Sequence, residues 1–254
     1  MDFHNHILAG VDDGARDAGE TRSALRVMYA AGVRLVIATP HLAASMTVDD
    51  KGAGYRARIA RALDDARRVA SMEAPDLRVE LGAEIMLDGA DANLSDPSSR
   101  LASTRFALVE FSLFGAPPAA PELLSGLSAR GWQPVLAHPE RYGGLSQSTL
   151  EEWHAAGTLL QVNAGSLLGD YGPHARRTTW ALLRTGLVHY ICSDYHARGR
   201  FRLAAALDAI EKSGGRSQSE RLVENGILLS RDEMPLDLAP LTPEPWYHSI
   251  FKRR

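Results

Sequence analysis

Two histidines near the start of the chain, His4 and His6, form a His-x-His pattern, and a loop with Asp12 and Asp13 follows them. Side chains alternate across a β-strand, so the two histidines lie on one face and can both reach a single metal ion. By itself this pattern is a weak indication, because a histidine at the end of a strand more often makes ordinary hydrogen bonds. Its meaning depends on which other residues the fold brings to it.

Further metal-binding residue types follow short apolar runs along the whole chain. Glu84, Glu110 and Asp194 stand within such runs, where an unpaired carboxylate is costly to bury and metal coordination is one of the few ways to keep it charged. A metal-binding residue type stands at the end of six or seven apolar runs in this one chain. This repetition predicts a metal site rather than unrelated hydrogen-bonding residues. The candidates beyond the first loop are His41, Glu84, Glu110, His138, Asp194 and His196.

These residue types also indicate the metal and its chemistry. Imidazole and carboxylate ligands without a thiolate favour manganese, iron or zinc. The candidates exceed what one ion can use, so about two or three ions that share carboxylates are expected. Such a cluster lowers the pKa of a bridging water, supplies hydroxide near neutral pH, and stabilises the attacking and leaving oxygens at phosphorus. The expected reaction is hydrolysis of a phosphoester by a metal-bridged hydroxide.

A phosphate group also needs guanidinium groups, whose planar fork matches its oxygens. Arg141, three residues after His138, can supply one, and Arg198 and Arg200 follow His196 closely. The alternative for each is a solvated arginine or a surface salt bridge. We expect Arg141 and Arg200 to bind phosphate, with Arg198 as the alternative to Arg200.

Cys192 and Arg198 have the C-x5-R spacing of cysteine-dependent phosphatases. The residues between them contain no glycine to turn backbone N–H groups towards a phosphate, and Asp194 would put an anion beside it. Cys192 also ends an apolar run, where a thiol is usually buried and unreactive. We therefore interpret this segment as a strand end followed by two metal ligands.

Short apolar runs alternate with longer segments of helical period, which is typical of βα units and a parallel sheet. Helices are expected over Ala18–Ala31, His174–Arg184 and residues 56–68. Strands with helices between them fit a closed or distorted barrel or a doubly wound open sheet. The barrel is favoured, because active sites of α/β barrels are built from C-terminal strand ends. Seven strands are expected, at Phe3–Leu8, Arg34–Ala38, Arg78–Ile85, Phe106–Phe111, Gln133–Ala137, Leu159–Val162 and Leu187–Cys192.

The composition limits the class of protein. The chain has 254 residues, 45% of them hydrophobic, a formal net charge of −3 and one cysteine. No linker divides it, so we expect a single domain over residues 1–254, with 234–254 a proline-rich C-terminal extension. The charge gives no basic field for nucleic acid, no run is long enough for a membrane span, and the lone cysteine fits the reducing cytoplasm. Association into a homo-oligomer is left open.

Several motifs follow one another in a fixed order: His4-Asn5-His6-Ile7-Leu8, Val11-Asp12-Asp13-Gly14, Ala38-Thr39-Pro40-His41, Gly82-Ala83-Glu84-Ile85, Val109-Glu110-Phe111, His138-Pro139-Glu140-Arg141-Tyr142, Asn163-Ala164-Gly165-Ser166-Leu167-Leu168-Gly169 and Ser193-Asp194-Tyr195-His196. This series resembles the PHP (polymerase and histidinol phosphatase) superfamily. It is most similar to the bacterial protein-tyrosine phosphatases of the CpsB/YwqE type, over nearly the whole chain to about Glu224.

The resemblance implies a distorted (β/α)7 TIM-like barrel and a cluster of Mn²⁺ ions. It implies catalytic roles for His138, for Arg141 and for an arginine that follows the Asp-x-His motif. In this chain Ala197 replaces the Asn that usually follows that motif, and Arg200 is the arginine expected to take this role. Relatives act on the phosphotyrosine cluster of a cytoplasmic kinase that controls capsule or exopolysaccharide synthesis, so the implied partner is a phosphotyrosine protein, in particular a bacterial tyrosine kinase tail. The implied metal ligands are His4, His6, Asp13, His41, Glu84, Glu110, His138, Asp194 and His196.

Three other functions are alternatives. A small-molecule phosphatase of the histidinol phosphatase kind would use the same metals behind a different pocket rim. A metallonuclease is disfavoured because no basic groove is evident and no further domain is attached. A binding module that has lost catalysis is disfavoured because the ligand set is complete. The other histidines are interpreted as structural or surface residues: His154, His174, His189 and His248.

Overall fold

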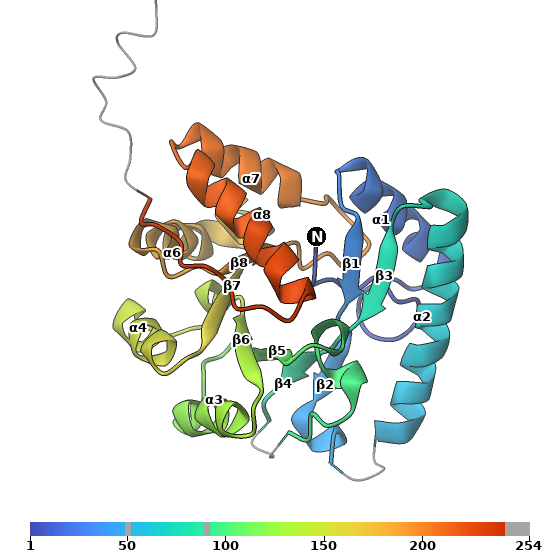
Figure 1. Cartoon of the computed structure of the whole chain (residues 1–254), viewed down its shortest axis with the longest axis horizontal. Coiled ribbons are helices and arrows are strands. Elements are labelled where there is room, and N and C mark those ends of the chain that lie inside the picture. The colour runs from blue at the N-terminus through green and yellow to red at the C-terminus, as the bar shows by residue number, and fades with distance from the viewer. Residues whose placement is uncertain (49–51, 89–91, 242–254) are drawn as a thin grey trace, which may run out of the picture.

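Helices and parallel strands alternate along the chain, as the apolar runs predict (Figure 1). The computed structural model describes residues 1–48, 52–88 and 92–241. The strands are β1 (Leu35–Ala38), β2 (His41–Ala43), β3 (Arg78–Leu81), β4 (Glu84–Met86), β5 (Phe106–Glu110), β6 (Gln133–Ala137), β7 (Leu159–Asn163) and β8 (Tyr190–Cys192). The helices are α1 (Ala18–Ala30), α2 (Ala53–Glu73), α3 (Ala120–Ala129), α4 (Gln147–Ala155), α5 (Ala164–Leu168), α6 (Gly172–Thr185), α7 (Leu203–Lys212) and α8 (Arg216–Ser230).

The strands form two parallel sheets. β1 pairs with β3, and the second sheet has the order β2-β4-β5-β6-β7-β8. The parallel α/β class is therefore confirmed, but the strands of the described residues do not close into a ring, and the expected TIM-like barrel is not confirmed. Figure 1 shows α3, α4 and α6 on one side of the strands and α1 and α2 on the other.

The segment Phe3–Leu8, expected as the first strand, is not a regular strand. Asp2 forms an isolated parallel bridge to Val36 in β1, and Asn5 forms one to Tyr195, just after β8. The segment therefore pairs with β1 at one residue and with the residues after β8 at another, and it forms no continuous ladder with either. His4 and His6 do reach one group of side chains, as expected, but the regular strand is absent from this segment.

The run Arg78–Ile85, expected as one strand, is divided into β3 and β4. Gly82 lies at the break, where a Cβ would come within 3.0 Å of a neighbouring side chain. A matching break at Pro40, which has no N–H to donate to a sheet, separates β1 from β2. Strand β2 was not predicted, and its register puts His41 opposite Glu84. The two breaks change the strand pairing close to the candidate ligands.

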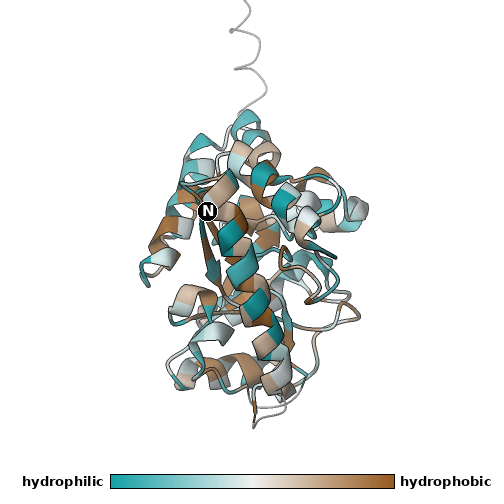
Figure 2. Ribbon diagram, turned by 90° about the vertical axis from the view of Figure 1, so that its right-hand side faces the viewer, coloured by the Kyte–Doolittle hydropathy of each residue, from teal (hydrophilic) through white to brown (hydrophobic). Residues whose placement is uncertain are grey.

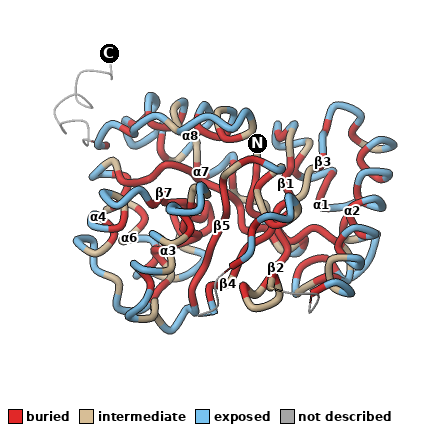
Figure 3. The backbone as a smooth tube through the Cα atoms, turned by 60° about the horizontal axis from the view of Figure 1, so that its bottom comes forward, coloured by how far each residue is buried: buried red, intermediate tan, exposed pale blue. Residues whose placement is uncertain are grey.

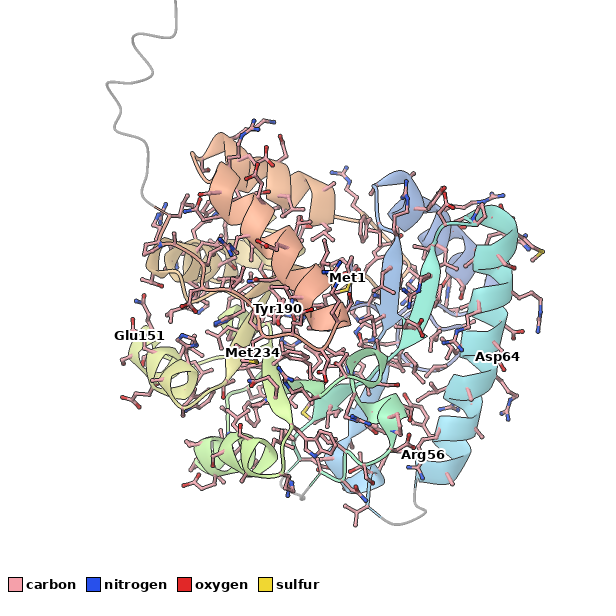
Figure 4. The ribbon with its side chains drawn as sticks, in the orientation of Figure 1. Met1, Arg56, Asp64, Glu151, Tyr190 and Met234 are labelled. Atoms are coloured by element: carbon pink, nitrogen blue, oxygen red, sulfur yellow. The ribbon has the colours of Figure 1, made fainter. Side chains whose placement is uncertain are left out.

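The helices begin and end where local chemistry favours it. The Asp17 side chain accepts hydrogen bonds from the first backbone N–H groups of α1 and caps that helix. Gly186, with φ 78°, ends α6 in a left-handed conformation that glycine adopts readily. Ile59 and Leu63 belong to the predicted apolar stripe of α2 and are buried. The outer face of α2 is largely hydrophilic (Figure 2), and Asp64 on it points to solvent (Figure 4).

Burial follows the layers of the fold. Strands β5, β7 and β8 are fully buried, whereas the outer sides of the helices are exposed (Figure 3). Successive residues of β5 point to opposite faces, as a strand requires. Phe106 and Leu108 join an apolar cluster with Phe3, while Ala107 and Val109 join the larger cluster that includes helix residues. Both faces of the strand are thus packed, which explains its nearly continuous apolar run.

Met1 and the segment that follows α8 lie against this helix. Met1 lies close to Gly226 of α8 (Figure 4). The Asn225 side chain forms hydrogen bonds of 2.8 and 2.9 Å with the backbone of Leu236. Of the predicted C-terminal extension, residues 242–254 and with them His248 lie outside the described residues. No helix in the described part of the chain is long and apolar enough to cross a membrane.

Candidate metal centre

The predicted metal ligands come from many elements and meet at one place. Several stand at strand boundaries: His41 begins β2, Glu84 begins β4, Glu110 ends β5 and His138 follows β6. Their side chains form four overlapping groups, in each of which the ligand atoms lie within 4.8 Å of one another. The groups are His6-Asp13-His41-His196, His4-His6-Asp194, His4-Glu84-His138 and His41-Glu84-Glu110. Together they contain every ligand that the resemblance implied.

Glu84 lies at the centre of this arrangement. Its Oε1 is 3.1 Å from His4 Nε2 and 2.8 Å from His138 Nε2. Its Oε2 is 3.3 Å from His6 Nε2 and 3.1 Å from His41 Nδ1. The two oxygens of one buried carboxylate thus face different sets of imidazoles. Such a carboxylate is suited to bridge two cations.

Asp194 faces the same cluster from the opposite side. Its Oδ1 is 3.5 Å from His4 Nε2 and 3.4 Å from His6 Nε2. Its Oδ2 accepts hydrogen bonds from Arg141 and Asn163, each at 2.7 Å. One oxygen is therefore available to a metal, while the other is held by neighbouring donors.

An outer group extends the cluster towards solvent. Asp13 Oδ1 lies 3.6 Å from His41 Nε2 and 3.5 Å from His196 Nε2. The Asp13 side chain is 66% exposed, whereas His6, which belongs to the same group, is buried. The cluster thus runs from a closed interior to an open mouth, where a substrate can approach.

Other side chains fix the orientation of the imidazoles. His4 Nδ1 lies 2.8 Å from Gln161 Oε1, and His6 Nδ1 lies 2.8 Å from Asp12 Oδ2. His196 Nδ1 is 3.0 Å from the backbone oxygen of Asp194. With Nδ1 occupied in this way, Nε2 of each ring is directed into the cluster, as in many metal sites.

The sequence prediction did not assign these supporting roles to Asp12 or Gln161. A signal existed for Gln161, because it and Asn163 are polar residues at alternate positions of an otherwise apolar strand and therefore share a face. Gln161 Nε2 donates to Asn163 Oδ1 at 2.9 Å, which links the support of His4 to that of Asp194.

The backbone is strained where the chain leaves two strands. His138 has φ 35° and Asp194 has φ 51°, in the left-handed region that non-glycine residues rarely adopt. Each such residue costs on the order of 1–3 kcal/mol and persists because its surroundings hold it. Both residues belong to the cluster, so the strain accompanies the turning of their side chains into it.

The concentration of charge shifts the pKa values of the cluster. Burial alone would lower the pKa of His4, but Glu84 and Asp194 outweigh it and raise the pKa to about 9. Burial likewise disfavours protonated His41, yet the neighbouring carboxylates of Glu110 and Glu84 raise its pKa to about 10. Burial would raise the pKa of Glu84, but His4 and its other imidazole neighbours hold it well below the usual range.

Buried atoms without partners test whether a metal fits. His4 Nε2, His6 Nε2 and Glu84 Oε2 are buried and form no hydrogen bond within the described residues. Leaving such groups unsatisfied is costly, and a cation at their centre would satisfy all of them. The donor set is also the one that manganese, iron or zinc binds. The residues therefore fit a metal centre.

The predicted phosphate-binding arginines lie in different environments. Arg141 donates to Asp194, and its guanidinium carbon lies 4.3 Å from the centre of the Tyr171 ring. Arg198 donates to the backbone oxygens of Asp13 and Gly14, at 2.6 and 2.8 Å. Its donors are thus used to hold the loop that carries Asp13.

Arg200 is exposed and has no hydrogen bond or ion pair within the described residues. It lines a cavity of about 280 Å³ together with Tyr171, Asp194 and His196. Of the two arginines after His196, Arg200 is thus the one that is free to meet an anion in this cavity. Tyr171, which lies between Arg141 and the cavity, was not predicted, because a tyrosine in a loop carries no specific signal.

The side chains that sequence reasoning set aside have structural surroundings. Cys192 is buried, and burial raises the pKa of its thiol well above the usual value, so it is not an activated nucleophile. Glu140 is buried and accepts a hydrogen bond from the backbone N–H of Asn163 at 2.9 Å. The rings of His154 and His189 contact each other at a tilt of 48°, and His174 is exposed on α6.

Comparisons with known proteins identify a family and relatives of this chain. A family model described as capsular polysaccharide synthesis, CpsB/CapC, matches residues 1–228. The tyrosine-protein phosphatase YwqE of Bacillus subtilis is 30% identical over 239 residues, which are 92% of this chain and 92% of that protein. The tyrosine-protein phosphatase CpsB of Streptococcus pneumoniae is 28% identical over 248 residues, which are 92% of this chain and 99% of that protein.

A solved structure of a related protein superposes closely on this chain. It comes from work on YwqE from Bacillus subtilis and CpsB from Streptococcus pneumoniae, described as unique metal-dependent tyrosine phosphatases. The two chains are 30% identical and superpose with a TM-score of 0.82, over 96% of this chain and 99% of the other.

Proposed function

The chain belongs to the CpsB/CapC family of capsular polysaccharide synthesis, and on that premise we propose that it is a metal-dependent tyrosine-protein phosphatase. One observation carries the proposal: all the predicted metal ligands lie together in overlapping groups, and Arg141 lies beside them. Its relatives named above are tyrosine-protein phosphatases, and they match this chain over nearly its full length.

We propose that Mn²⁺ occupies the cluster, with iron or zinc as the alternatives, held by the imidazoles and carboxylates of the four groups. The central position of Glu84, between two sets of imidazoles, supports more than one ion. When bound, such ions activate water and stabilise the oxygens at a phosphorus centre.

The side chains of the protein supply binding and orientation. Arg141 and Arg200 bind the phosphoryl oxygens, Arg141 from beside Asp194 and Arg200 from the wall of the neighbouring cavity. His138 contributes its Nε2 to the cluster next to Glu84. A tyrosine leaving group has a pKa of about 10 and needs less protonation than an alkoxide, so a separate general acid is not required. The hydrogen bond that Glu140 accepts from Asn163 supports a structural role for Glu140.

The proposed substrate is a phosphotyrosine protein of capsule or exopolysaccharide synthesis, such as the tail of a bacterial tyrosine kinase in the cytoplasm. We further interpret the whole chain as one domain with a distorted barrel architecture. What supports this is the bridging of the N-terminal segment to Val36 on one side and to Tyr195 on the other. Association of copies is left to measurement of the molecular mass in solution.

One experiment separates the proposed activity from its rivals. Metal-stripped protein is resupplied with Mn²⁺ and given a phosphotyrosine peptide, histidinol phosphate and single-stranded DNA in parallel. We expect cleavage of the peptide. Cleavage of histidinol phosphate alone would identify a small-molecule phosphatase, and no cleavage by metal-loaded protein would refute the hydrolase.

A pair of variants links the activity to the cluster. His138→Ala removes a buried imidazole from Glu84 and is expected to lose both metal and activity. His174→Ala changes an exposed histidine of α6 and is expected to lose neither. Full activity of the His138→Ala protein would exclude the cluster as the active site.

A further inference from the structure

Helix α6 presents a basic face outside the candidate metal centre. Arg176, Trp180 and Arg184 lie four residues apart, and Arg177 stands beside them, so all four share one side of the helix. The three arginines are exposed and Trp180 is half-buried. This basic face was not predicted from the sequence, because the net charge is negative and the helical period spreads these arginines along the chain.

These residues line a groove of about 760 Å³ with Lys212 at the corner between α7 and α8, and no carboxylate lines it. Within the described residues, Arg176, Arg177 and Arg184 form no hydrogen bond or ion pair. Some other helix arginines are paired, such as Arg68 of α2, which forms an ion pair with Asp65. Like charges on one helix face repel each other, so an uncompensated row of them favours an anionic partner.

The groove begins close to the active-site cavity. Tyr171, which lines that cavity, directly precedes α6. At about 1.5 Å per residue, Arg177 lies about 9 Å and Arg184 about 20 Å along the helix axis from Tyr171. An extended peptide advances about 3.3 Å per residue, so about three to six residues span the same distance.

We propose that this groove binds an acidic segment of the protein substrate, about three to six residues from the phosphotyrosine that enters the metal centre. The inference rests on the proposed phosphatase function. The arginines form ion pairs with Asp or Glu side chains of the substrate segment. Trp180 packs against the backbone of that segment and the aliphatic parts of its side chains. The groove thereby selects among phosphotyrosine sites without contact to the reacting phosphate.

The charge of the groove excludes the nearest segment of this chain as its anionic occupant. Residues 242–254 carry one Glu but three basic residues, Lys252, Arg253 and Arg254. That segment does not supply the negative charge that the groove favours, and we assign the groove to a partner from outside the chain. The proximity of the metal centre favours the substrate over an unrelated partner.

The test compares two sets of phosphotyrosine peptides of equal length. The acidic set carries Asp and Glu at the positions three to six residues before or after the phosphotyrosine, and the neutral set carries Asn and Gln at the same positions. With Mn²⁺-loaded wild-type protein, we expect the acidic peptides to have a KM roughly fivefold lower, in keeping with a few exposed ion pairs. The variant Arg177→Glu/Arg184→Glu is expected to abolish this difference while activity on free phosphotyrosine is unchanged. The advantage is also expected to decline with added salt.

Arg61→Glu is the matched control, because Arg61 is an exposed arginine without a partner in the described residues, on α2 at the opposite side of the molecule (Figure 1). It is expected to keep the preference. If the double variant fails to fold, Arg177→Gln/Arg184→Gln takes its place.

Two outcomes would overturn the proposal: equal KM values of wild-type protein for acidic and neutral peptides, or a preference that survives charge reversal. Fluorescence anisotropy with a labelled, unphosphorylated acidic peptide gives a readout that does not depend on catalysis. Loss of this binding in the double variant supports the groove even if no peptide is cleaved, in which case it is the phosphatase function that fails. Competition by single-stranded DNA but not by the acidic peptide would assign the groove to nucleic acid instead.

Discussion

Arg141 donates from Nη1 to Asp194 Oδ2 at 2.7 Å, so the proposed phosphate binder and a proposed metal ligand share a hydrogen bond. Tyr171 lies under the same guanidinium and also donates to Asp194, at 3.3 Å. Arg141 is therefore held by a carboxylate and a ring before any substrate arrives. This pre-positioning reduces the entropy that phosphate binding would otherwise cost.

Replacing Arg141 tests its role in phosphate binding. Arg141→Ala removes a charge-assisted hydrogen bond worth about 1.5–3 kcal/mol, so kcat/KM on a phosphotyrosine peptide should fall about 10- to 150-fold. Arg141→Lys keeps the charge but not the planar fork and should recover only part of the loss. Steady-state kinetics measure this, with Arg61→Ala as the control. A fully active Arg141→Ala protein would remove Arg141 from the site.

Replacement of Arg198 and replacement of Arg200 by alanine should have different effects on activity and stability. Arg200→Ala should lower kcat/KM about tenfold and leave the melting temperature unchanged, because Arg200 is exposed and forms no hydrogen bond or ion pair with a described residue. Arg198→Ala should instead lower the melting temperature and weaken metal retention, since Arg198 holds the backbone of Asp13 and Gly14. Kinetics, thermal unfolding and metal analysis of both proteins decide the matter. The opposite pattern would make Arg198 the phosphate binder.

Gln161 is expected to control metal affinity without being a ligand. Gln161→Leu removes the acceptor that faces His4 Nδ1 and should weaken metal binding about 10- to 100-fold. Gln161→Glu retains an acceptor at this position and should keep most of the affinity. Titration of the apo proteins with Mn²⁺ in competition with a chelator measures both. Equal affinities of the Leu variant and the wild type would show that His4 needs no such support.

His189 should make stability depend on pH. The Leu160 N–H donates to His189 Nδ1 at 3.0 Å, so the ring must be neutral there. Burial, with a smaller contribution from His154, lowers the pKa of His189 from 6.5 to about 3. Below pH 6.5 the unfolded chain therefore binds a proton that the folded chain does not, and the free energy of unfolding falls as the pH drops towards 3.

Urea unfolding at pH 7.5 and pH 5 checks this contribution. Between these two values, His189 should account for a loss of about 2 kcal/mol. His189→Asn retains an acceptor for the Leu160 N–H but does not titrate, so its loss should be smaller than that of the wild type by this amount. Identical pH dependence in the two proteins would show that His189 is not the group responsible.

The cluster of candidate metal ligands was predictable because residue type and position agreed. A carboxylate such as Glu110 at the end of a fully buried strand has few explanations, and parallel strands bring their ends to one edge. The supporting contacts were less accessible: Gln161 meets His4 across 157 positions of the sequence. That contact depends on which strands are neighbours, and no local pattern specifies this.

The limits on the fold prediction have the same origin. β5 and β6 were located closely because both of their faces are packed and their apolar runs are continuous. The segment Phe3–Leu8 has the pattern of a strand, but its neighbours change along its length, and hydropathy does not register a change of partner. β2 is too short to show any periodicity.

The N-terminal segment and the end of β8 are tied together by Asp2, whose side chain accepts hydrogen bonds from the Ser193 backbone N–H at 3.0 Å and from its hydroxyl at 2.5 Å. A ribosome releases the N-terminal end of a chain first, so His4 emerges long before His196. The complete cluster therefore cannot assemble on a chain that is only half synthesised. Occupation of all four proposed groups by metal would therefore have to follow translation of at least the first 196 residues.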